Sequence, residues 1–244
     1  MTMKSHFQKR GSAALRGILA IALAGMPVTI AQAQPAGKPS TVTGLTGMWF
    51  LEQDDFETPV EPPYRPEARA MVEEREAQEN AGKVIDDETR ACEPIGLPGI
   101  MLSEFPLEIL ETPGRITIIS EMSPLVRTVY LNRKKATEGL PPMYNGYSMG
   151  HWEGETLVIE TDNFNDTGFP FRFGNAVHSA TTTMTERISL SEDGQMLVDE
   201  MTLRDPRYLT DSYKIVRHYK RLPEDSELWE SPCMVGWKDD PTAL

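Results

Sequence analysis

Two side chains with acid–base chemistry share one face of a long predicted strand. His178 and Glu186 are separated by an even number of residues, so an extended chain points both side chains to the same side. A histidine beside a carboxylate can move a proton as a general acid–base pair. Together with Tyr213 and Tyr219 on the last predicted strand, the pair predicts a catalytic site that needs no cofactor. The alternative to a catalytic role is that His178 and Glu186 belong to a polar cluster at the mouth of a barrel, in which every polar group is hydrogen-bonded.

The segment Gly146-Tyr147-Ser148-Met149-Gly150 fits the pattern G-x-S-x-G. In α/β-hydrolases this pattern exposes a nucleophilic serine on a sharp turn from a strand into a helix. Here residues 151–161 are typical of a strand, a tight turn and a second strand, and no helix follows. We therefore interpret Ser148 as a strand serine beside glycines that allow close packing.

Aromatic and inward-facing side chains predict a site for a small hydrophobic or aromatic molecule. Tyr147 and Trp152 belong to an aromatic group around two predicted loops, and Met184 and Arg217 lie on the inward faces of later strands. Ligand pockets are mostly apolar, with a few polar groups that orient the ligand. We predict these four residues as ligand-binding, with ordinary loop packing as the alternative.

The histidines do not predict a metal site. His151, His178 and His218 follow the first 33 residues, and none of them is spaced as H-x-H or H-x-x-x-H. Zinc would therefore need ligands from separate strands. We predict no metal and no cofactor.

Strands must position these residues. The expected strands are 45–53, 107–111, 115–121, 126–132, 147–152, 156–161, 178–190, 195–204 and 212–221. Most of them are joined by short turns such as Glu192-Asp193-Gly194. One helix, about 66–81, begins with Pro66 and carries a thin apolar stripe, which places it on the surface. We predict a mainly β protein whose antiparallel up-and-down meander closes into a lipocalin-like barrel.

Alternation assigns the inward faces. On the last strand, Tyr213, Ile215, Arg217, Tyr219 and Arg221 share the face that we expect inside the barrel. The inward set of residues 178–190 is polar at its start and apolar at its end. Such a graded face suits a barrel that is plugged at one end and open at the other.

Two resemblances accompany these patterns. Gly47-Met48-Trp49 on the first strand, with an arginine on the last, is similar to the arrangement in lipocalins and related calycin barrels. There the tryptophan closes the base of the barrel and the arginine packs across it. The resemblance implies a structural role for Trp49, with Arg217 or Arg221 over its ring as a cation–π partner.

The second resemblance covers most of the chain after residue 33. Residues 146–161, which contain the motif G-x-W-E-G-[DE]-x-L-V, are followed by Phe164-Asn165, His178-Ser179 and Thr185-Glu186-Arg187. This order resembles a family of uncharacterised exported bacterial proteins. The likeness implies export and a single domain, and it implies no activity.

The N-terminal residues have the pattern of a secretory signal peptide. Lys4, Lys9, Arg10 and Arg16 precede an apolar stretch, and Ala31-Gln32-Ala33 forms a small-residue cleavage site. We predict a signal peptide at 1–33, a disordered leader at 34–43 and one β-barrel domain at 44–244. The protein is then periplasmic or secreted, without a membrane anchor.

The net charge limits the partners that we expect, and the two cysteines bear on the compartment. Without residues 1–33, the chain keeps 20 Lys and Arg against 37 Asp and Glu, a formal charge of −17. Such a surface repels phosphate backbones, so nucleic acid is not an expected partner. Cys92 and Cys233 are the two cysteines, and an oxidising compartment would let them form a disulfide bond. Two buried thiols are the alternative.

Three functions follow from these observations. The first is an exported barrel that binds a small hydrophobic or aromatic molecule. The second is a cofactor-independent lyase, isomerase or hydratase that uses His178 and Glu186. The third is a structural or interaction module of the cell envelope, which would expose an apolar patch.

Overall fold

The computed structural model describes residues 44–55, 61–81, 94, 96–122, 125–133, 139–166 and 178–229. All of them belong to one compact unit, residues 38–244. The predicted signal peptide (1–33) and leader (34–43) lie outside the described residues, and so do Cys92 and Cys233 with their predicted disulfide bond. In the described ranges, no helix combines the length and the apolar character needed to span a bilayer.

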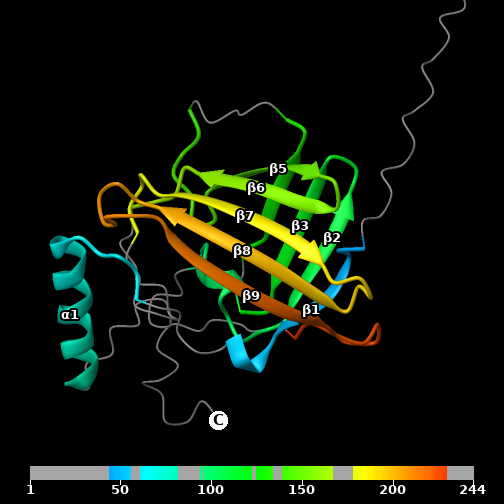
Figure 1. Cartoon of the computed structure of the whole chain (residues 1–244), viewed down its shortest axis with the longest axis horizontal. Helices are drawn as coiled ribbons and strands as arrows, with labels where there is room; N and C mark the ends of the chain where they lie inside the picture. The colour runs from blue at the N-terminus through cyan, green and yellow to red at the C-terminus, as the bar shows by residue number, and fades with distance from the viewer. Residues whose placement is uncertain are drawn as a thin grey trace, which may run out of the picture. The chain divides into compact units, whose positions relative to one another are not determined.

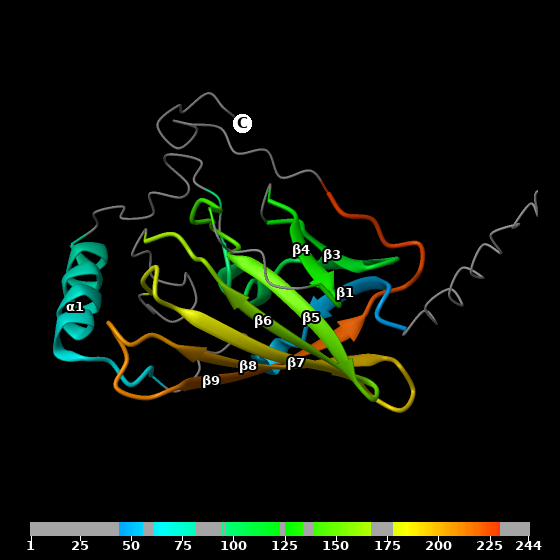
Figure 2. The same ribbon diagram turned by 90° about the horizontal axis from the view of Figure 1, so that it is seen from above.

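In the described part of the chain, nine strands form a closed barrel (Figures 1 and 2). The predicted fold class, a mainly β barrel with one early helix, is confirmed. The strands are β1 (Gly47–Leu51), β2 (Leu107–Thr112), β3 (Arg115–Ser120), β4 (Arg127–Leu131), β5 (Tyr147–Glu153), β6 (Thr156–Asp162), β7 (Thr183–Leu190), β8 (Met196–Arg204) and β9 (Tyr213–Arg221). Short 3-10 helices lie at η1 (Gln53–Asp55) and η2 (Gly99–Met101).

Each strand pairs with the next along the chain, and β1 pairs with β9 to close the barrel. All these pairs are antiparallel except β4 and β5, which run parallel. A parallel pair needs a long connection that returns the chain to its starting end. The 15 residues between β4 and β5 are long enough for such a connection, whereas tight turns join β2 to β3, β5 to β6 and β7 to β8. The meander is therefore interrupted once.

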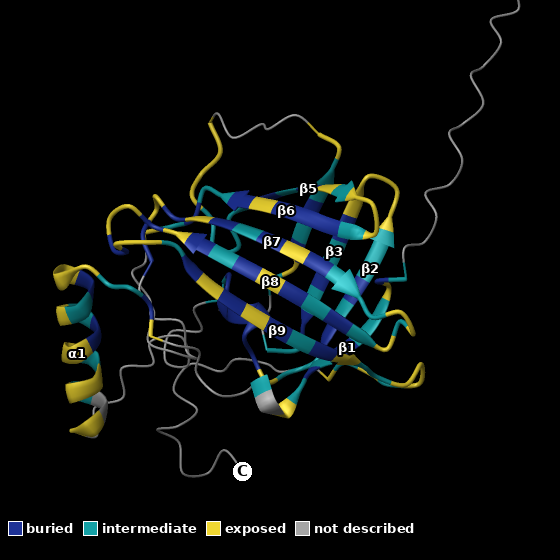
Figure 3. Cartoon of the chain, viewed as in Figure 1, coloured by how far each residue is buried: buried dark blue, intermediate teal, exposed yellow. Residues whose placement is uncertain are grey.

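The barrel interior follows the alternation of the strands (Figure 3). On β9, Tyr213, Ile215, Arg217 and Tyr219 are buried, and the residues between them are exposed or half-buried. Apolar side chains from eight of the nine strands form one continuous buried cluster, which η2 joins with Ile100 and Met101 and against which Trp152 of β5 packs. Burying this surface is the main stabilising contribution to the fold.

The helix α1 (Pro66–Asn80) packs separately from the barrel interior. Its buried residues Ala68 and Val72 contact Tyr208, which lies in the loop between β8 and β9. The amide of Arg65, just before the helix, donates to the carbonyl of Tyr208. The thin apolar stripe of the sequence thus covers one tyrosine, and the rest of the helix is largely exposed.

Residues 178–182 do not extend β7, although the alternation predicted a strand over 178–190. The carboxylate of Asp205 accepts from the amide and hydroxyl of Ser179, at 2.7 and 3.0 Å, and from the hydroxyl of Thr182 at 2.8 Å. These bonds hold the segment in a turn. Local side-chain hydrogen bonds of this kind compete with the bonding pattern of a sheet.

Trp49 and Arg221 face each other where β1 pairs with β9. The Trp49 ring is fully buried, and its indole N–H donates to the carbonyl of Leu45 at 2.9 Å. The guanidinium carbon of Arg221 lies 4.1 Å from the centre of the ring. Of the two arginines that the sequence offers, Arg221 is therefore the one over Trp49. Its guanidinium also donates to backbone carbonyls of Gly44, Thr46 and Gly194.

We expect Arg221→Met to lower the free energy of unfolding by about 3 kcal/mol, because it removes a cation–π contact and three charge-assisted hydrogen bonds. Urea unfolding followed by tryptophan fluorescence measures the loss. Arg187→Met is the matched control, since Arg187 forms an exposed ion pair with Glu153 on the outer face. Equal losses in the two variants would contradict a structural role for Arg221.

Candidate functional site

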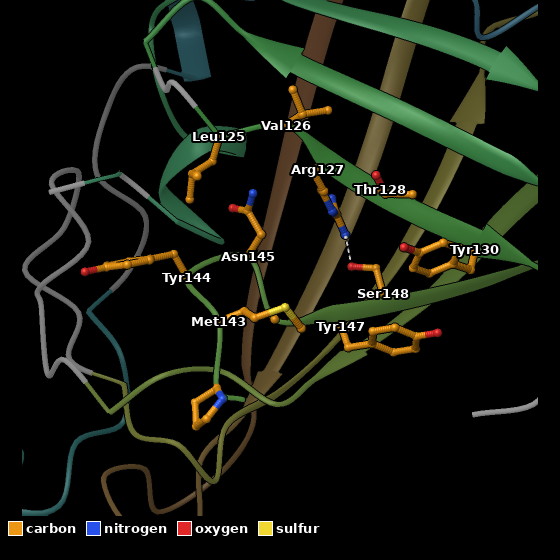
Figure 4. A pocket seen from close by; sticks show the side chains of 12 residues that line it. Leu125, Val126, Arg127, Thr128, Tyr130, Met143, Tyr144, Asn145, Tyr147 and Ser148 are labelled. Carbon is orange, nitrogen blue, oxygen red and sulfur yellow. Dashed lines mark hydrogen bonds between the residues drawn. The ribbon is translucent and has the colours of Figure 1, made fainter. Parts of the chain in front are cut away.

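A cavity of about 380 Å³ opens where β4 and β5 begin. Figure 4 shows its lining, which comes from the start of each strand and from the loop before β5. Tyrosine, methionine and aliphatic side chains alternate with a few polar groups. The lining residues are Leu125, Val126, Arg127, Thr128, Tyr130, Pro142, Met143, Tyr144, Asn145, Gly146, Tyr147 and Ser148.

The cavity lies beside the first residues of β4 and β5, before the parallel pairing of these strands begins. Val129 and Ser148 are the first residues of β4 and β5 that face each other across the pair. Arg127 and Thr128 pair with β3 on their other side, and Tyr147 pairs with β6. The first residues of β4 and β5 are thus held by β3 and β6 on their outer sides. Side chains of these first residues line the cavity.

Two stacked tyrosines flank the opening. The ring centres of Tyr130 and Tyr147 are 5.2 Å apart with an interplanar angle of 26°. The guanidinium carbon of Arg133 lies 4.7 Å from the centre of the Tyr130 ring. Stacked aromatic pairs add to the stability that their buried area provides. This stack therefore orders one wall of the cavity.

The glycines around Ser148 are required by close contacts. Gly146 has a φ of +58°, and a Cβ there would lie 2.6 Å from the carbonyl oxygen of Asp162. A Cβ on Gly150 would lie 2.8 Å from a methyl group of Val129. The G-x-S-x-G pattern thus brings β5 close to its neighbours and presents the Ser148 side chain to the barrel interior.

Arg127, which forms the floor of the cavity, belongs to a buried ion pair with Glu186. Arg127 and Glu186 have side chains that are 1 and 0% exposed. Both terminal nitrogens of the guanidinium donate to the carboxylate, Nη1 to Oε1 at 2.7 Å and Nη2 to Oε2. This paired geometry is the strongest that an arginine and a carboxylate can form. Glu186 raises the pKa of Arg127, against the lowering effect of burial.

Two hydroxyl groups extend this cluster. The Oγ of Ser148 and the Oγ1 of Thr161 are 2.8 Å apart, and both accept from Arg127 Nη2, at 3.4 and 3.5 Å. Figure 4 shows Arg127 and Ser148 directed toward each other across the start of the two strands. Ser148 is therefore a bonded strand serine.

Asp199 lies next to the ion pair and is fully buried. Neither of its carboxyl oxygens has a hydrogen-bond partner in the described residues. Burial, and then the negative charge of Glu186, raise the pKa of Asp199 well above its ordinary value, and the positive charge of Arg127 offsets only part of this effect. The surroundings of Asp199 therefore favour its protonated form.

The structure separates the predicted catalytic residues. Glu186 is bonded to Arg127, whereas the His178 ring packs edge-on against Phe164 with ring centres 5.8 Å apart. Burial lowers the pKa of His178. Tyr219 donates to the carbonyl of Met101, and burial, then Asp199 and Glu186, raise the pKa of its hydroxyl. Burial also raises the pKa of Tyr213, at the opposite end of β9.

The predicted ligand-binding residues are also dispersed. Tyr147 lines the cavity, and the other three do not. Met184 is part of the apolar core, and Trp152 packs against that core from a half-buried position. Arg217 is buried, faces Asp199 across β8 and β9, and donates to the carbonyl of Val216 at 3.0 Å.

Arg127 and Asp199 are the functional candidates that sequence reasoning missed. Their strands carried the signal, because Arg127 alternates with Val129 and Leu131, and Asp199 alternates with the inward residues of β8. A charged residue in an apolar alternating set predicts a buried charge that needs a partner. Within the described ranges, no three His, Cys, Asp or Glu side chains are grouped so that they could hold a metal ion.

No protein-family model and no curated protein sequence matches the chain. Among solved structures, it is similar to a secretary abundant heat soluble (SAHS) protein from Ramazzottius varieornatus. The TM-score is 0.37 and the sequence identity 10%, and the match covers 76% of this chain and 100% of that chain. At this level the likeness carries no inference about activity or ligands.

We expect Glu186→Gln to lower the free energy of unfolding by about 3 kcal/mol, because it leaves the Arg127 charge buried without its partner. The loss is at the lower end of the usual range, since Asp199 can then ionise beside Arg127. Urea unfolding measures it. In the double variant Arg127→Met, Glu186→Leu, most of the stability returns. A double variant as unstable as Glu186→Gln would contradict this account.

The raised pKa of Asp199 gives stability a definite pH dependence. The native state holds this proton more tightly than the unfolded chain, so the contribution of Asp199 falls as the pH rises from about 4 toward the raised pKa. Asp199→Asn cannot ionise, so we expect its stability relative to the wild type to increase from pH 5 to pH 9. Urea unfolding at both pH values measures the difference, with the exposed Asp225→Asn as control. A difference that stays constant with pH would refute the prediction.

Proposed function

We propose that the chain is an exported β-barrel protein that binds a small hydrophobic or aromatic molecule in the cavity between β4 and β5. The observation that carries the proposal is the cavity itself, with its aromatic wall and its buried polar floor. Its volume of about 380 Å³ lies within the range of small-molecule sites in proteins. Export is supported by the signal-peptide pattern of residues 1–33.

The chemistry of the lining favours a ligand that is largely apolar. Tyr144, Tyr147 and Met143 provide aromatic and polarisable surface, which suits flat rings and flexible chains. The charge of Arg127 is already balanced by Glu186, so the floor carries no excess charge that would demand an ionised ligand. Binding would therefore depend on apolar contact, with a few hydrogen bonds that fix orientation.

We expect 2-naphthol to bind in a saturable manner, and we expect Tyr147→Ala to weaken its binding about tenfold because one aromatic wall is lost. Isothermal titration calorimetry measures both affinities. Trp229→Ala is the matched control, since Trp229 is an aromatic residue that is 77% exposed and does not line the cavity. Its affinity should equal that of the wild type.

Native mass spectrometry of the protein purified from its own source would identify the natural ligand as an added mass that disappears in Tyr147→Ala. Two results together would overturn the proposal. One is a protein that carries no added mass, and the other is 2-naphthol binding that is absent or equal in the wild type and Tyr147→Ala.

A further inference from the structure

The cavity lining holds two buried polar atoms that have no hydrogen-bond partner in the described residues. They are Nε of Arg127 and Oδ1 of Asn145. A buried polar group without a partner is costly, and native proteins leave few of them unless water or a ligand satisfies them. The first atom is a donor and the second an acceptor. A ligand group that both accepts and donates a hydrogen bond could therefore satisfy both atoms.

The Arg127 donor is left over from the ion pair. Glu186 takes both terminal nitrogens, and Ser148 and Thr161 accept further bonds from one of them. Nε–H remains, on a side chain that is 1% exposed. Because the guanidinium is held at its far end by Glu186, Arg127 cannot turn to satisfy this group elsewhere without breaking the ion pair.

Asn145 and Arg127 lie at the same end of the parallel pair of β4 and β5. Val129 of β4 faces Ser148 of β5 in a parallel pair. Arg127 lies two residues before Val129, and Asn145 lies in the turn three residues before Ser148. Because both side chains line the same cavity, a ligand held there can contact both of them. Figure 4 shows Arg127 and Asn145 together in the lining.

We propose that the ligand of this cavity carries a carboxamide group, which Arg127 and Asn145 recognise together. The carbonyl oxygen of the amide accepts from Nε–H of Arg127, and its N–H donates to Oδ1 of Asn145. The inference rests on the proposed function, because it names the polar half of the molecule whose apolar half lies against Tyr144, Tyr147 and Met143.

Two related groups fit this pair of atoms less well. A carboxylate would accept from Arg127 but would turn its second oxygen toward Oδ1 of Asn145, and it would add a negative charge close to Glu186. An ester also accepts from Arg127, but it has no hydrogen to donate, so Oδ1 of Asn145 stays without a partner. A site built to bond an N–H group rejects analogues that lack it.

The test compares three ligands that share one aromatic body: 2-naphthamide, 2-naphthoate and methyl 2-naphthoate. With the full chain in isothermal titration calorimetry, we expect the amide to bind at least tenfold more tightly than the acid and the ester. In Asn145→Leu, the amide should lose this advantage over the ester, because the acceptor is gone. Gln195→Leu is the control, since it removes an exposed amide side chain from the turn between β7 and β8.

The outcomes separate this inference from the proposed function. Equal affinities of the amide and the ester in the wild type, or an amide advantage that survives in Asn145→Leu, would overturn the inference. If 2-naphthol still binds and depends on Tyr147, the proposed function stands without it. Circular dichroism checks that Asn145→Leu is folded, and Asn145→Ala replaces it in the same comparison where it is not.

Discussion

The structure depends on one buried interaction, the ion pair between Arg127 and Glu186. It joins β4 to β7 across the interior of the barrel, although these strands are not neighbours in the sheet. The bonded hydroxyls of Ser148 and Thr161 connect β5 and β6 to the same guanidinium. A buried pair of this kind is weak evidence for added stability, but breaking it is costly. It therefore fixes which side chains can lie at the start of β4 and β5, and with them the floor of the cavity.

Most of the fold could be predicted because alternation along a strand reports burial directly. The residues that alternate with Tyr213 are inside the barrel, and the strand boundaries differ from the expected ones by a few residues. Alternation says which face is buried but says nothing about which strand lies beside it. The parallel pairing of β4 and β5 could therefore not be predicted, since it depends on how the chain connects Leu131 to Tyr147. The turn at 178–182 was not predicted either, because it is held by hydrogen bonds to Asp205, which lies far along the sequence.

The candidate site was less predictable, for a related reason. His178 and Glu186 were paired because they share a parity on one predicted strand, and the turn before β7 removed the basis of that argument. Glu186 found its partner on β4 instead, through the closure of the barrel. Tyr147 does line the cavity, in a part of the sequence where aromatic residues gather, and its role in binding stays a prediction. Arg127 could have been found by noting that a charged residue alternates with the apolar residues of its strand. Asn145 could be found only from the structure, since an amide side chain in a loop belongs to no sequence pattern.

The interior charges explain why the cavity has a neutral floor. Asp199 and Arg217 face each other across β8 and β9, yet the two form no ion pair in the described structure. The guanidinium of Arg217 turns to the carbonyl of Val216. Arg127 donates to one carboxylate, that of Glu186, while burial and then the charge of Glu186 raise the pKa of Asp199. Because Glu186 balances the charge of Arg127 beside the cavity, a ligand of the proposed kind would be selected by hydrogen bonds and apolar contact rather than by its charge.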